Sequence, residues 1–69
     1  MINDGLILNT LTNEGATSRD VWKKIGRWSD ISIHQHLIRM SEAGIIDRYK
    51  HPVPSGFQWM FRLKQEQDA

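Results

Sequence analysis

The chain contains no cysteine and only two prolines among its 69 residues, and it has no long apolar run. Without cysteine, neither a disulfide nor a thiolate-bound zinc ion can stabilise the fold. A membrane-spanning helix needs roughly 20 consecutive apolar residues, and no segment approaches that length. The N-terminal residues also lack the basic and apolar regions of a secretion signal. We therefore expect a cytoplasmic protein with no membrane partner.

The sequence also lacks a recognisable catalytic arrangement of residues. No pairing of a nucleophile with a base can be argued from the spacing, and no glycine-rich phosphate loop is present. A chain this short buries only about 60% of the surface of its unfolded form, which leaves little room for an enclosed pocket. The sequence therefore predicts a single small domain that is not an enzyme and needs no cofactor.

Net charge is only +1, but the charges are unevenly distributed. All nine lysines and arginines lie between Arg19 and Lys64, together with only four carboxylates, an excess of five positive charges. The carboxylates outside this segment are Asp4, Glu14, Glu66 and Asp68. A basic central segment favours a polyanionic partner. Many ordinary solvated surfaces have a similar composition.

Capping signals predict two helices in the first part of the chain. Asn3 or Asp4 can cap a helix that runs to about residue 12. Thr17 and Asp20 have the spacing of a capping box at the start of a second helix. Gly26 can end that helix, because glycine adopts the left-handed conformation at low cost.

A third helix is predicted between Ser29, which can cap it, and Gly44, which can end it. Its buried stripe would be Ile33, Leu37 and Met40, which recur at helical spacing. Two helices joined by a glycine-bearing turn are typical of the helix-turn-helix unit.

The C-terminal part predicts a β-hairpin with strands at residues 45–51 and 57–63 and a turn at 52–56. Phe57, Trp59, Phe61 and Leu63 alternate with more polar residues, the period expected of a half-buried strand. Residues 16–17 could add a minimal strand. Since an isolated hairpin is marginal in water, we expect the aromatic side chains to pack on the helices and supply much of the core.

The segment SDISIHQHLIRMSEAGIIDR, residues 29–48, resembles the stretch from recognition helix to wing in MarR-type regulators. Gly44-Ile45-Ile46-Asp47-Arg48 matches the run that leads into the wing of that family. The size and the aromatic second strand are more similar to the small PapI/FaeA-like regulators. The resemblance covers about residues 6–64 and implies an α+β, mainly α, winged helix-turn-helix that binds duplex DNA and regulates transcription. We expect this domain at residues 1–64, followed by a polar tail at 65–69.

In such a fold the third helix enters the major groove. If Ile33, Leu37 and Met40 point inward, the opposite side presents polar residues that can pair with bases, with two isoleucines that could contact thymine methyls. These candidates are Ser32, Gln35, Arg39, Ile31 and Ile38. Gln35 stands where MarR-type helices often carry an arginine. A solvated helix face is the simpler interpretation of the same pattern.

Backbone contacts are expected from the second helix and from the wing, because phosphate contacts position a protein without selecting a sequence. The candidates on and after the second helix are Arg19, Lys23, Lys24, Arg27 and Ser29. Those on the wing are Arg48, Lys50 and His51.

Two alternatives to DNA binding follow from the same residues. Exposed Ile31 and Ile38, with a net charge near zero, favour a protein-interaction module, an inhibitor or adaptor, that uses these two residues and the wing of the same scaffold. His34 and His36 suggest a metal site, but residues two apart on a helix point about 200° apart, so we expect none. The sequence also allows a homodimer, whose interface would have to use the first helix or the tail.

Overall fold

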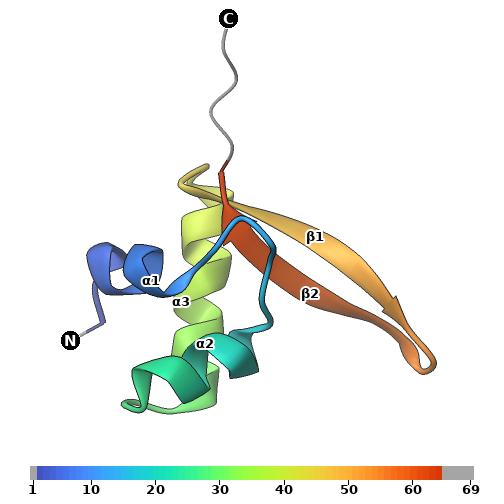
Figure 1. The fold of residues 1–69 in the computed structure, drawn as a ribbon, viewed down its shortest axis with the longest axis horizontal. Coiled ribbons are helices and arrows are strands. Elements are labelled where there is room, and N and C mark those ends of the chain that lie inside the picture. The colour runs from blue at the N-terminus through green and yellow to red at the C-terminus, as the bar shows by residue number, and fades with distance from the viewer. Residues whose placement is uncertain (1, 65–69) are drawn as a thin grey trace, which may run out of the picture.

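The computed structural model describes residues 2–64, which form three helices followed by a two-stranded antiparallel sheet (Figure 1). This α+β, mainly helical domain agrees with the expected element order, and the polar tail predicted at 65–69 lies outside the described residues. In residues 2–64 no helix is long and apolar enough to cross a membrane. The elements are α1 (Asp4–Thr10), α2 (Ser18–Ile25), α3 (Asp30–Glu42), β1 (Ile46–Val53) and β2 (Gly56–Leu63).

The ends of α2 and α3 are set by local hydrogen bonds, as predicted. The Thr17 hydroxyl accepts from the Asp20 amide at 3.1 Å, and the Asp20 carboxylate accepts from the Thr17 amide at 3.2 Å, a complete capping box. Gly26 ends α2 with a φ of 72°. At the end of α3, the Ile45 amide donates to the Met40 carbonyl and the Gly44 amide to the Ser41 carbonyl. This pair of bonds is the Schellman motif, which stops the helix before β1.

The core is made of eight buried apolar side chains, and every helix and both strands contribute to it or pack against it. Ile33, Leu37 and Met40 are its α3 members, which confirms the predicted inward direction of that helix. The remaining members are Ile7, Leu11, Val21, Ile46 and Phe61.

The hairpin is longer and its turn tighter than the sequence suggested. Pairing is continuous from Ile46 opposite Leu63 to Val53 opposite Gly56, so only Pro54 and Ser55 form the loop. Pro52 and Val53 therefore belong to β1 and not to the predicted turn. Among the described residues β1 pairs only with β2, and an edge strand tolerates a residue without an amide hydrogen.

The predicted short strand at residues 16–17 is confirmed for Ala16 alone. Its amide donates to the Phe61 carbonyl and its carbonyl accepts from the Phe61 amide, both at 2.8 Å. The Leu63 amide also donates to the Thr12 carbonyl at 3.1 Å. These bonds fasten the loop between α1 and α2 to the base of β2.

The expectation that all three aromatic residues of β2 fill the core is wrong. Phe61 is fully buried, Trp59 is partly buried and Phe57 is 50% exposed. The reason is the direction of the hairpin, whose base rests on the helices and whose tip projects beyond them (Figure 1). The alternation along β2 therefore predicts on which face of the sheet each side chain lies, but not how deeply that side chain is buried.

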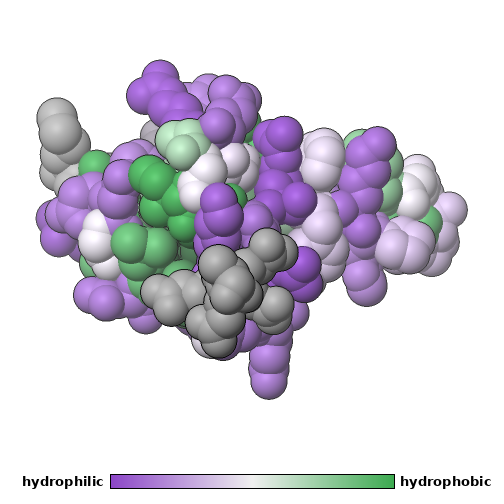
Figure 2. All heavy atoms as spheres, turned by 90° about the horizontal axis from the view of Figure 1, so that it is seen from above, coloured by the Kyte–Doolittle hydropathy of each residue, from purple (hydrophilic) through white to green (hydrophobic). Residues whose placement is uncertain are grey.

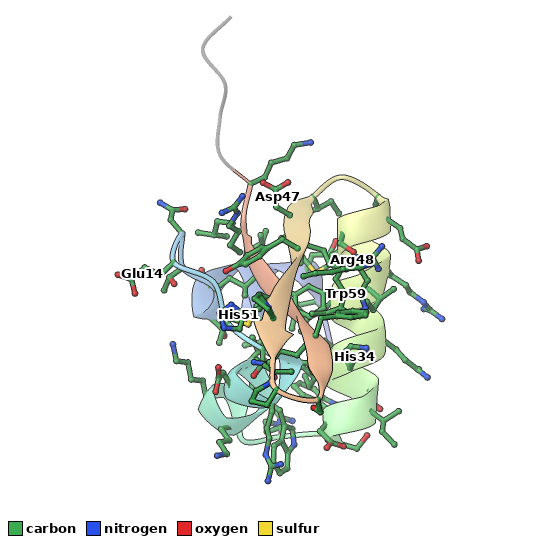
Figure 3. All side chains as sticks on the ribbon, turned by 90° about the vertical axis from the view of Figure 1, so that its right-hand side faces the viewer. Glu14, His34, Asp47, Arg48, His51 and Trp59 are labelled. Atoms are coloured by element: carbon green, nitrogen blue, oxygen red, sulfur yellow. The ribbon has the colours of Figure 1, made fainter. Side chains whose placement is uncertain are left out.

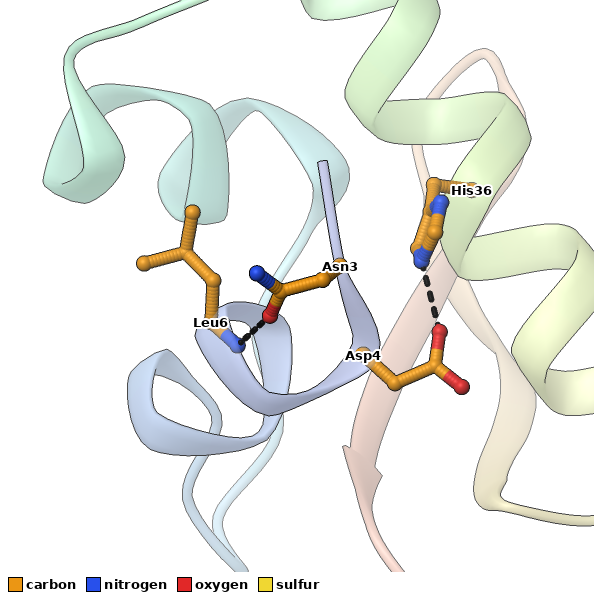
Figure 4. Close-up of polar contacts among 4 residues, drawn as sticks. All are labelled: Asn3, Asp4, Leu6 and His36. Atoms are coloured by element: carbon orange, nitrogen blue, oxygen red, sulfur yellow. Dashed lines mark hydrogen bonds and ion pairs between the residues drawn. The ribbon is translucent and has the colours of Figure 1, made fainter. Parts of the chain in front are cut away.

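One contact between α1 and α3 was not anticipated. The Asp4 carboxylate lies 2.8 Å from the His36 imidazole, while the neighbouring Asn3 caps α1 by accepting from the Leu6 amide at 2.8 Å (Figure 4). Residues 32 apart in sequence thus join the start of α1 to the middle of α3.

Candidate nucleic-acid interface

The polar side of α3 faces away from the core, as expected. Ser32, Gln35 and Arg39 are all exposed, and so is Glu42 at the end of the helix. This side therefore offers an amide, a guanidinium and a hydroxyl to solvent, three groups that can form hydrogen bonds with base edges.

Ser29 and Ser32 are already linked to each other. The Ser29 hydroxyl accepts from the Ser32 amide at 3.1 Å and donates to the Ser32 hydroxyl at 3.0 Å. Because Ser29 caps α3 in this way, its side chain has little capacity left for a phosphate. Ser32 keeps its own hydroxyl hydrogen free to donate.

Two open hollows lie next to each other along α3 and share His34 and Gln35 in their linings, and we refer to the two together as the depression along α3. The hollow nearer the start of α3 is also lined by Ser18, Arg19, Asp30 and Ile31. The other is also lined by Ile38, Arg39 and Glu42. Arg19 of α2 therefore shares the first hollow with Gln35, Arg39 of α3 shares the second with Gln35, and each hollow also contains a carboxylate.

The two isoleucines predicted on this side differ in exposure. Ile31 is 67% exposed, the most exposed of the large apolar side chains described. Ile38 is only partly exposed and packs against the core. His34, one turn before Ile38 on the same side of α3, meets Phe61 of the hairpin. Ile38 is therefore less exposed than predicted, although it still lines one hollow, and Ile31 is the more available apolar contact.

The four cations of α2 and its turn are exposed, as predicted. Arg27 places its guanidinium 4.7 Å from the centre of the Trp28 ring. Within residues 2–64 none of the four lies within 4.0 Å of a carboxylate. Of these four cations, only Arg19 borders the depression along α3. The remaining three, which do not, are Lys23, Lys24 and Arg27.

The hairpin has two distinct faces, because side chains alternate along each strand. The inner face comprises Ile46, Arg48, Lys50 and Pro52 of β1 with Phe57, Trp59, Phe61 and Leu63 of β2. Its buried members Ile46 and Phe61 rest on the helices. Figure 3 shows Arg48 and Trp59 projecting from the hairpin toward α3, where His34 lies. His34 and Phe61 meet edge to face, with ring centres 6.0 Å apart.

The two cations of the inner face are held by aromatic rings. The Arg48 guanidinium lies 4.5 Å from the centre of the Trp59 ring. The Lys50 ammonium lies 4.6 Å from the Phe57 ring and 5.7 Å from the Trp59 ring. Such contacts stabilise a cation by about 0.5–1 kcal/mol at an exposed site and restrict its rotamers. The side chains of Arg48 and Lys50 are therefore already oriented before a ligand binds.

His51 does not belong with these cations. It alternates with Lys50 and so lies on the outer face, with Asp47, Tyr49, Gln58, Met60 and Arg62 (Figure 3). His51 lies on the hairpin with Arg48 and Lys50, but on the opposite face, since adjacent strand residues point to opposite faces.

Arg62, the one arginine of the outer face, contacts two side chains of the hairpin itself. Its Nε lies 4.0 Å from the Asp47 carboxylate across the strands, and its guanidinium lies 4.8 Å from the Tyr49 ring. Arg62 thus has a nearby carboxylate, whereas Arg48 and Lys50 have none within 4.0 Å among the described residues. Unpaired positive charge on the hairpin is concentrated on the inner face.

The two histidines of α3 serve different contacts. His34 packs against Phe61, and His36 faces Asp4. Within residues 2–64 no three histidine, cysteine, aspartate or glutamate side chains cluster in a way that could hold a metal ion.

Comparison with protein-family models, with curated proteins and with solved structures finds no match to this chain. The surface must therefore be interpreted from its own chemistry.

Sequence reasoning missed three members of this surface: His34, Trp59 and Phe57. The two aromatic residues were assigned to the core because of their alternation. One signal could have revealed the two aromatic residues: a two-residue loop at Pro54-Ser55 sets a register that puts Trp59 and Phe57 on the same face of the hairpin as Arg48 and Lys50.

Proposed function

We propose that this chain is a winged helix-turn-helix domain that binds duplex DNA and regulates transcription. In this proposal α2 and α3 are the helix-turn-helix and the β1–β2 hairpin is the wing. The three-helix and C-terminal hairpin layout is compatible with that fold. DNA binding would locate the protein at the nucleoid in the cytoplasm.

The observation that carries the proposal is the clustering of cations around the depression along α3. Arg19 borders it from α2 and Arg39 lies within it. Arg48 projects toward α3 from the inner face of the wing (Figure 3). Asp30 and Glu42 also line the depression, each at one end of α3. The middle of the helix is left to Gln35, which can pair bidentately with adenine.

Each group of residues then has a distinct role. Gln35, Arg39 and Ser32 contact base edges, and Ile31 touches a thymine methyl. Arg19, Lys23, Lys24 and Arg27 contact phosphates on one side of the groove, while Arg48 and Lys50 do so on the other. Phosphate contacts supply most of the affinity and base contacts the specificity.

The test is selection from a pool of randomised duplexes by the wild-type protein and by Arg39→Ala. We expect the wild-type protein to enrich a short common sequence and Arg39→Ala to lose preference at one position of it. One good bidentate contact contributes about 1–3 kcal/mol of discrimination. Gln58→Ala, on the outer face of the hairpin, is the matched control and should enrich the wild-type sequence. No enrichment by the wild-type protein would contradict sequence-specific binding.

A protein partner is the second candidate function, and exposed apolar side chains favour it. Ile31 is 67% exposed, Phe57 50% and Ile45 39%. Apolar anchors at an interface centre can cost about 2 kcal/mol or more on truncation, whereas charges at its edge matter little. If a protein that binds this chain is found, a larger loss of affinity for it in Ile31→Ala than in Arg39→Ala would support this function. The reverse ranking on duplex DNA would support the first.

A further inference from the structure

Phe57 is an aromatic side chain in an unusual place. It lies at the tip of the wing, opposite Pro52 and next to the two-residue loop of Pro54 and Ser55. Half of its surface is exposed. Figure 2 shows hydrophilic and less polar side chains interspersed along this projecting hairpin, with no continuous apolar patch there on the face in view. An isolated exposed ring at a tip needs an explanation other than core packing.

The ring is held in a fixed position by its neighbours. Phe57 meets Trp59 edge to face, with ring centres 5.4 Å apart and planes at 83°. The Lys50 ammonium lies 4.6 Å from the Phe57 ring. Trp59 is only partly exposed and its ring contacts Arg48 and Phe57, so the more exposed Phe57 is the ring that a base pair can reach. Phe57 therefore projects as a single apolar group flanked by positive charge.

We propose that Phe57 is a wedge that inserts between two base pairs from the minor groove and bends the duplex, an inference that rests on the proposed DNA binding. Side chains such as phenylalanine and proline act in this way in proteins that kink DNA. Lys50 and Arg48 contact the phosphates beside the wedge, where the minor groove concentrates negative potential.

Charge favours DNA over a protein as the occupant of this tip. From Arg48 to Arg62 the hairpin contains four residues that are or can be positively charged and no carboxylate. The two cations of the inner face, Arg48 and Lys50, are those that contact Phe57 and Trp59. A phosphate backbone complements these two cations beside the inserted ring.

The experiment uses the duplex that the wild-type protein enriches from a random pool. The duplex is labelled at its two ends for energy transfer, and it carries 2-aminopurine at flexible pyrimidine–purine steps. Binding is followed by fluorescence anisotropy, bending by energy transfer and unstacking by 2-aminopurine emission. We expect the wild-type protein to bend the duplex by about 20–90°, the range of known wedges, and to raise the emission at one step. Phe57→Ala should still bind and lose both signals, while Phe57→Leu should retain part of each.

Gln58→Ala is the matched control, because it lies beside Phe57 on the outer face, and it should bend the duplex as the wild-type protein does. Circular dichroism melts verify that each variant is folded. If Phe57→Ala does not fold, the 2-aminopurine signal of the wild-type protein and of Phe57→Leu decides the question.

A wild-type protein that binds without bending or unstacking, or a folded Phe57→Ala that bends equally, would overturn the wedge and leave DNA binding intact. A wild-type protein that binds no duplex would overturn the proposed function and the wedge with it.

Discussion

Phe61 and Trp59 occupy successive inner-face positions of β2, yet they differ in what holds them. Phe61 is fully buried, meets His34 edge to face and forms both backbone bonds to Ala16. Trp59 is partly buried and its ring is occupied by Arg48 and Phe57. At the scale of the residue, the first therefore stabilises the fold and the second mainly orders the wing.

This difference predicts unequal costs of truncation. Phe61→Ala should lower the free energy of unfolding by about 3–5 kcal/mol, the usual range for a buried large aromatic residue. Trp59→Ala should cost about 1–2 kcal/mol, since it loses partial burial and a cation–π contact. Urea denaturation followed by circular dichroism measures both. Equal costs would mean that Trp59 is a core residue after all.

Gly15 gives a second prediction at this scale. It has a φ of 99°, and a Cβ there would clash with the Tyr49 hydroxyl, which donates to the Glu14 carbonyl. Gly26 has a φ of 72° with no atom within 4 Å of a Cβ, so it tests backbone strain alone. Gly26→Ala should cost about 1–2 kcal/mol and Gly15→Ala clearly more. A smaller cost for Gly15→Ala in the same urea titration would contradict the packing of Tyr49 on this loop.

At the scale of the element, the helices were predictable because their signals are local. Thr17 with Asp20, Ser29 and Gly44 each act within a few residues, so the sequence predicts where α2 and α3 begin and end. The burial of Phe57 and Ile38 depends instead on where the hairpin leaves the helical body. That direction is a tertiary property, and alternation or helical periodicity carries no information about it.

The α2 element yields a prediction about binding. Lys23→Ala and Lys24→Ala should weaken binding to any duplex about equally and reduce the salt slope by about 1 each, since phosphate contacts carry no sequence information. Fluorescence anisotropy at several salt concentrations measures this slope.

Lys64→Gln is the control for lost charge. Lys64 donates to the Gly44 carbonyl just beyond the C-terminal end of α3, and it lines neither hollow of the depression along α3. Its substitution should leave the salt slope unchanged. A change of sequence preference in either α2 variant, with the slope intact, would mean that α2 contacts bases and not phosphates.

At the scale of the whole molecule, the arrangement of elements decides which predicted residues act together. Arg19 and Arg39 each share a hollow of the α3 depression with Gln35, and Arg48 projects toward α3 from the wing (Figure 3). His51 is separated from that group by the alternation of β1, and Ser29 is used in the cap of α3. The sequence could indicate a basic surface but not its division between the two faces of the hairpin.

The central claim is that this surface binds duplex DNA through several phosphate contacts. Its most direct test is the affinity of the wild-type protein for a random-sequence duplex between about 50 and 200 mM salt, measured by fluorescence anisotropy. Six candidate phosphate-contacting cations, Arg19, Lys23, Lys24, Arg27, Arg48 and Lys50, should give a slope of log K against log salt of about −5, at about −0.9 per contact. An affinity that does not change with salt, or no association at the lowest salt concentration, would contradict it.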